Sequence, residues 1–162
     1  MANAIEKTAI SDIGTMLFKK DASSNKYKYL FPITAAPATG GAPGQIEVTE
    51  LDSRYVQNIL DRDATPAFEF TYNYTAERYQ LASTTFDGIT SHDLMLVFGD
   101  GSGFKFTGIG ATWTDSLSTG NAVTGQVSVA VSYKEFAADT TSLVDTSTIP
   151  AGRVYKGAVV NA

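Results

Sequence analysis

A strand meander between residues 93 and 133 is the feature of this sequence that most restricts its fold. An apolar run at 94–98 is followed by the glycine-rich segment 99–103, and then by residues 104–107, where apolar and polar side chains alternate. Period-two alternation on both sides of a glycine turn is the strongest short-range signal for a β-hairpin. Residues 126–133 alternate in the same way. The sequence therefore predicts three antiparallel strands at the centre of a small β domain.

Four further segments have the composition of strands, namely 14–20, 26–31, 46–51 and 68–74. In the segment 46–51, Ile46 and Val48 are expected to face the core. The segment 68–74 carries an aromatic residue at every second position, which is typical of a half-buried strand. Together with the meander, these segments predict a mainly β fold.

Two long loops and one short helix are expected between these strands. Residues 32–44 contain three prolines and three glycines, and residues 52–66 are irregular and charged. Loops of roughly 12 or more structureless residues are uncommon in compact domains and usually serve function or contact. Thr75 can cap a helix over 75–86, with Glu77 in its first turn.

At 162 residues the chain has the length of one domain with extensions. We expect a flexible arm at 1–12, a β domain at 13–134, and a C-terminal arm at 135–162. The C-terminal arm contains apolar residues beyond a Ser- and Thr-rich stretch. It is expected to dock onto a neighbouring molecule or back onto the same sheet.

Composition excludes several classes of protein. The longest apolar run is far shorter than the ~20 residues that a membrane helix needs, and residues 1–7 do not resemble a signal segment. We therefore expect a soluble protein made in a cytoplasm. The chain has no cysteine, so it has no disulfide or thiolate metal site. Its net charge of −5 disfavours ordinary nucleic-acid binding, which depends on Lys and Arg.

Residues that suggest catalysis or ligand binding have simpler structural interpretations. His92, the one histidine, has no adjacent nucleophile and is interpreted as a surface or turn residue. The glycines of 99–103 precede a strand, whereas a phosphate-binding fingerprint opens a helix. The Asp-Arg-Asp run at 61–63 lacks the glycine and glutamate of a calcium loop, so its charges are expected to be solvated.

Three other features leave alternatives open. Glu47 and Glu69 could form a general acid and base for glycoside hydrolysis, but outward positions on strands carry such residues for solubility. The aromatic residues of 68–74 could form a sugar-binding platform, although the core face of a strand is the favoured interpretation. Trp113 could anchor either the core or an interface. We expect no enzymatic activity, no cofactor and no bound metal.

The order of the elements resembles the major tail tube proteins of long-tailed, non-contractile bacteriophages. The resemblance is carried by Glu-Leu-Asp-Ser at 50–53 and by Phe-Thr-Tyr-Asn-Tyr-Thr at 70–75, which leads into a helix. It covers roughly residues 13–134. No immunoglobulin-like domain follows the core, as it does in some members of the family.

The resemblance implies a β-sandwich or barrel-like subunit with one flanking helix, which forms hexameric rings whose inner sheets join into a channel. The rings stack through long loops and arms into a virion tail tube, a conduit for DNA ejection, assembled in the host cytoplasm. Partners would be the tape measure, tail tip and tail terminator proteins; DNA would pass without specific binding, and no membrane is involved. The candidate inter-subunit residues lie in the 52–66 loop and are Asp52, Arg54, Tyr55, Asp61, Arg62 and Asp63.

An acidic lumen would let DNA slide, because it repels phosphate. The candidate lumen residues are Glu47, Glu50 and Glu69. Three other functions remain open at this point. One is a tube component of a bacterial secretion or injection system, another a carbohydrate-binding β-sandwich, and the third a small hydrolase with paired carboxylates.

Overall fold

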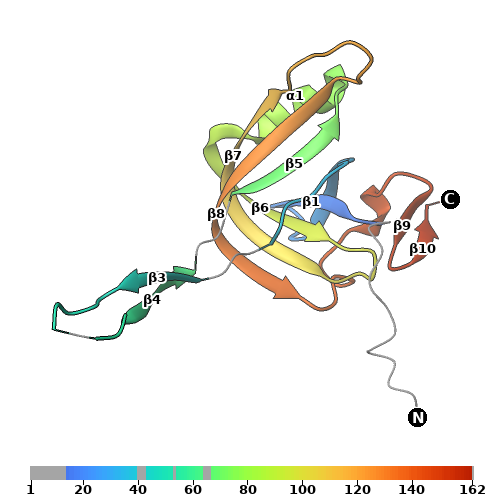
Figure 1. Ribbon diagram of the computed structural model, residues 1–162. Coiled ribbons are helices and arrows are strands. Elements are labelled where there is room, and N and C mark those ends of the chain that lie inside the picture. Colours follow the sequence, from blue (N-terminus) through green and yellow to red (C-terminus); the bar gives the residue numbers. More distant parts are fainter. Residues whose placement is uncertain (1–13, 40–42, 53, 64–66, 162) are drawn as a thin grey trace.

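The fold is mainly β, as the sequence predicts, and contains one large antiparallel sheet with a short helix (Figure 1). This computed structural model describes residues 14–39, 43–52, 54–63 and 67–161. The elements in chain order are β1 (Met16–Lys20), β2 (Tyr27–Phe31), β3 (Pro43–Glu47), β4 (Asn58–Asp63), β5 (Phe68–Asn73), α1 (Ala76–Thr85), β6 (Asp87–Val97), β7 (Gly103–Thr114), β8 (Thr124–Ala137), the 3₁₀ turn η2 (Thr146–Thr148), β9 (Arg153–Tyr155) and β10 (Ala158–Val160). Within the described ranges, no helix has the length and apolar character of a membrane span.

The large sheet has the strand order β2-β1-β6-β7-β8-β5, and every neighbouring pair is antiparallel. The sheet curls, because the chain just after β2 reaches the strand at the opposite edge. The amides of Thr34 and Ala35 both donate to the carbonyl of Thr71 on β5, over 2.7 and 3.4 Å, and the Thr71 amide donates to the carbonyl of Ala35 over 3.2 Å. The curled sheet therefore encloses a core in the manner of a barrel.

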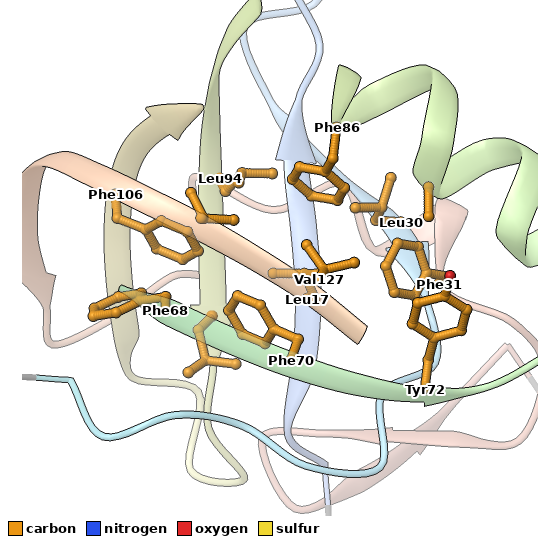
Figure 2. Packing of buried hydrophobic residues seen from close by; sticks show 13 residues of the cluster. Leu17, Leu30, Phe31, Phe68, Phe70, Tyr72, Phe86, Leu94, Phe106 and Val127 are labelled. Carbon is orange, nitrogen blue, oxygen red and sulfur yellow. The ribbon is translucent and has the colours of Figure 1, made fainter. Parts of the chain in front are cut away.

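The core inside the curl consists of aromatic and aliphatic side chains from most of its strands (Figure 2). On β5 the alternation holds as predicted, since Phe68, Phe70 and Tyr72 are fully buried and the residues between them are not. Phe106 contacts the rings of both Phe68 and Phe70, with centroid separations of 4.9 and 6.0 Å. The buried members are Leu17, Leu30, Phe31, Phe68, Phe70, Tyr72, Ala82, Phe86, Leu94, Leu96, Phe106, Val127 and Val129.

Helix α1 covers one open end of the curled sheet (Figure 1). Thr75 caps it as predicted: its hydroxyl accepts a hydrogen bond from the amide of Arg78 over 3.2 Å. Ala82 and Phe86 are buried in the core, and Tyr79 packs partly against it. The cap and these apolar positions locate the helix correctly from the sequence.

Strands β6, β7 and β8 form the predicted meander but extend further than its pattern indicates. The turn lies where the glycines predict it, with the amide of Phe98 donating to the carbonyl of Ser102 over 2.8 Å. Gly103 is required there, since a Cβ atom would lie 2.3 Å from the carbonyl oxygen of Leu96. Strand β8 continues to Ala137, past the predicted end of the domain at 134.

The chain after β8 returns to the sheet and covers the outer face of β1, β2 and β6. Thr140 is fully buried there, and its hydroxyl bonds the carbonyl of Gly101 over 2.6 Å and the hydroxyl of Tyr155 over 2.8 Å. Residues 135–162 are predicted to dock either onto a neighbouring molecule or back onto the same sheet. Their described part packs on its own sheet. The second apolar cluster consists of Met16, Phe18, Tyr27, Met95, Val97, Val144, Ile149 and Tyr155.

Strands β3 and β4 form a separate two-stranded hairpin that projects from the large sheet (Figure 1). The prediction of an irregular loop over 52–66 is wrong at β4, which pairs with β3 through Ile46 and Ile59. The predicted inward direction of Ile46 and Val48 is also wrong, because these side chains are 45% and 42% exposed. Alternation assigned them to one face of a strand, but no part of the described core covers that face.

Candidate assembly surfaces

The side chains that the structure describes give the β3–β4 hairpin an apolar face and a polar face, although the register also places Leu60 opposite Gln45 on the polar one. Ile46 is directly opposite Ile59, and Val48, just after the end of β3, lies two residues further along on the same face. These three side chains are between 42% and 51% exposed. Gln45, Glu47 and Asn58 occupy the opposite face. The hairpin therefore has an apolar surface that the described part of its own chain does not bury.

The connection between β3 and β4 also exposes apolar side chains. Leu51 is fully exposed, and Tyr55 and Val56 are 75% and 69% exposed. Of the candidate inter-subunit residues, Asp52, Arg54 and Tyr55 lie in this connection. The candidates at 61–63 belong to β4, and their side chains lie outside the described part of the structure.

A second uncovered surface is the outer face of β5, the first half of β8, and the part of β7 opposite it. The strand register places its members on one face, in rows that run across the three strands. Hydroxyl, amide and small side chains dominate, and none of the members is Lys or Arg. They are Glu69, Thr71, Asn73, Ile109, Ala111, Trp113, Thr124, Gln126, Ser128 and Ala130.

A hydrogen-bond network fixes the polar groups of this β5–β8–β7 face. Thr71 donates to the amide oxygen of Gln126 over 2.9 Å, and the Gln126 amide nitrogen donates to Asp115 over 2.7 Å. The hydroxyl of Thr124 donates to the same Asp115 oxygen over 2.7 Å. These two donors lower the pKa of Asp115 below its ordinary value. Asp115 therefore stays ionised beside the face.

The candidate lumen acids are not brought together. Glu69 lies on the β5–β8–β7 face, whereas Glu47 lies on the polar face of the hairpin and Glu50 follows β3. The sequence analysis missed Asp115 because its role depends on Thr124 and Gln126, which only the β7–β8 pairing places beside it. Its position just after a strand carried no distinguishing signal.

Several of the residues that the sequence suggested for catalysis or ligand binding lie within strands of the large sheet. Phe68, Phe70 and Tyr72 are fully buried, so they form a core face and cannot be a sugar-binding platform. Trp113 is 44% exposed on the uncovered face, outside the core. His92 lies within β6, partly buried, and burial is the main cause that lowers its pKa. Among the described residues, no group of three or more His, Cys, Asp or Glu side chains could hold a metal ion.

Comparison with known proteins gives a match in structure and none in sequence. The chain matches no family description and no curated protein sequence. A solved structure described as the tail of an empty GTA (gene transfer agent) particle, computed with helical refinement in C6 symmetry, shares its fold. The TM-score is 0.55 at 11% identity, and the match covers 77% of this chain and 96% of that chain. This likeness shows a fold that also occurs in the tail of a phage-like particle.

Proposed function

We propose that this chain is a structural protein of a virion tail that assembles into stacked hexameric rings and so forms the tail tube. The observation that carries the proposal is the fold shared with a C6-symmetric tail over 96% of that chain. At 11% identity the likeness concerns fold, so the assembly itself has to be supported by the surfaces of this chain.

The hairpin supports self-assembly. A two-stranded hairpin alone is at best marginally stable in water, and three strands or a packed face are needed for stability. The hairpin face of Ile46, Val48 and Ile59 is exposed, and no described part of the chain packs against it. In the proposed ring, the hairpin and the connection at its tip contact neighbouring copies.

The β5–β8–β7 face supports a conduit role. Glu69 on the face and the ionised Asp115 beside it are acidic, and no member of the face carries a positive charge. A surface of this charge repels phosphate, so DNA passing along it would find no series of Lys and Arg contacts to hold it. We assign this face to the lumen, with Asp115 added to Glu69 as a lumen acid.

The remaining parts of the proposal follow from a tail role. The tube would be assembled in the host cytoplasm, end on tail tip and tail terminator proteins, and enclose a tape measure protein before DNA passes through. The chain would have no enzymatic activity.

Electron microscopy of the purified protein over a concentration series tests the proposal. We expect rings or tubes of uniform diameter above a threshold concentration. A protein that stays monomeric to millimolar concentration, in low and in high salt, would contradict it.

A further inference from the structure

Strand β8 is paired on both sides over only part of its length. β5 follows β8 as far as the pair Phe68 and Val129, whereas β7 follows it to Ala137. In the part of the chain that the structure describes, no backbone hydrogen bond reaches the other side of residues 130–137. Among the described residues, the second half of β8 is therefore an open sheet edge, at the end of the sheet away from α1 (Figure 1).

Other edges of the sheet are closed by the chain itself. At β2, the Tyr27 amide donates to the carbonyl of Leu143 over 2.8 Å, and the Asp145 amide donates to the carbonyl of Tyr27 over 2.9 Å. The first half of β6, which β1 does not reach, is bulged, and Asp87 accepts hydrogen bonds from the amides of Ile89 and Thr90 over 2.9 and 2.8 Å. Bulges and covering segments are the usual protections of a sheet edge.

The second half of β8 has one of these protections, a bulge at Ser132 between the pairs Gly108–Val131 and Thr107–Tyr133, but its pairing with β7 is regular beyond the bulge, from Tyr133 to Ala137. The ammonium of Lys134 bonds the carbonyl of Thr39, and Glu135 pairs with Lys105 over 3.1 Å. Both charges are thus engaged within the chain. Tyr133 and Phe136 are each 56% exposed.

An aromatic row ends at this edge. The ring of Phe98 contacts that of Phe104 at 6.0 Å, and Phe104 contacts Phe136 at 5.3 Å across the β7–β8 pair. Phe136 is the last member of this row, and its side chain is more than half exposed. A strand added beside β8 would continue the row with its own apolar side chains.

The same chain carries the complementary element. Among the described strands, nothing pairs with either edge of the β3–β4 hairpin, which has an apolar face and backbone hydrogen bonds within itself, such as the Val48 amide to the carbonyl of Gln57 at 2.8 Å. We infer that the hairpin of one copy adds to the open half of β8 in a neighbouring copy, with Ile46 and Ile59 beside Phe136. This inference rests on the proposed self-assembly and specifies the contact that closes a ring or joins two rings.

Cysteine cross-linking tests this contact, because the chain has no cysteine of its own. Ile46→Cys and Phe136→Cys variants are mixed in equal amounts, assembled and oxidised. Directly opposed side chains on paired strands have Cβ atoms about 4.5–5.5 Å apart, close to the separation in a disulfide. We expect a covalent dimer in the assembled fraction and none in dilute monomer. The matched control pairs Ile46→Cys with Leu81→Cys, which is 44% exposed on α1, and should give no dimer.

The double variant carrying Ile46→Cys and Phe136→Cys separates the remaining outcomes. A covalent ladder that stops at the hexamer places the contact within a ring, and a ladder that continues places it between rings. A disulfide within a single chain would overturn the inference. Tubes without the cross-link would overturn it too while the proposed function stood, and absence of any assembly would overturn both.

Hydrogen exchange on the unmodified protein gives a second test that does not depend on the cysteine variants. Assembly should slow exchange in residues 130–137 and in the hairpin together. If either segment kept its monomer exchange rates in intact tubes, strand addition at this edge would be wrong.

Discussion

Removing the apolar face of the hairpin should raise the concentration needed for assembly and leave the subunit folded. The perturbation is the triple substitution Ile46→Ser, Val48→Ser and Ile59→Ser. Full burial of such a side chain contributes about 1.5–3 kcal/mol. Since these side chains are 45%, 42% and 51% exposed, about half of that contribution remains for assembly. The three together should contribute about 3 kcal/mol per subunit added, using ~1 kcal/mol for each.

At about 1.4 kcal/mol per factor of ten, this loss corresponds to a roughly 100-fold rise in the concentration at which tubes form. Sedimentation of tubes across a concentration series measures that threshold. Thermal unfolding by circular dichroism should change little, because the three side chains belong to neither of the two buried clusters.

The matched control replaces the opposite face of the same hairpin, with Gln45→Ser, Glu47→Ser and Asn58→Ser. These polar side chains are already solvated, so the threshold should stay within a few-fold of that of the unmodified protein. An unchanged threshold in the apolar-face variant, or an equal rise in both variants, would refute the reasoning.

Three further predictions concern charge, pH and packing. Replacing Glu69 and Asp115 by Lys should leave tube formation intact and slow DNA ejection in low salt, with recovery in high salt; equal ejection rates at all salt concentrations would count against the assigned lumen face. Backbone and hydroxyl donors of its own turn hold the pKa of Asp87 at about 2, below the ordinary 3.8, so its stabilising effect is complete above about pH 4 and lost as the pH falls toward 2. Asp87→Asn should therefore flatten urea stability between pH 4 and 2, and an unaltered acid profile would exclude that role. Gly125→Ala should lower the free energy of unfolding by about 1–3 kcal/mol in urea, because the new Cβ would lie 2.2 Å from the Tyr72 ring; a loss below ~0.5 kcal/mol would show that the ring moves aside.

Local patterns predicted the elements of the core. Three features each follow a rule that acts over a few residues: the alternation in β5, the glycine turn before Gly103, and the capping of α1 by Thr75. Such rules do not depend on which strand lies beside which. This is why the mainly β class and the flanking helix could be predicted from the sequence.

The hairpin was misread because alternation identifies an apolar face without identifying what covers it. Ile46 and Val48 do share a face, but the described core lies elsewhere. β4 was missed because its charged residues and the turn signals around it are equally typical of a loop. An apolar face that no described part of the chain covers is suited to a contact between copies.

Two apolar runs in the sequence, in β1 and β6, bear on the placement of the C-terminal segment. Met16, Leu17 and Phe18 are consecutive apolar residues and are all buried, as are the residues of β6 from Leu94 to Val97. Continuous apolar runs indicate strands covered on both faces. They therefore indicate that something lies on the outer face of β1 and β6. The Ser- and Thr-rich stretch did not show that Val144 and Ile149 are the residues that do so.

Cryo-electron microscopy of the assembled protein tests the central claim most directly. We predict a tube of stacked six-membered rings, with Glu69 and Asp115 facing the lumen and the hairpin of each copy against a neighbour. A reconstruction with the β5–β8–β7 face on the outside, or with the hairpins free in solvent, would contradict the account.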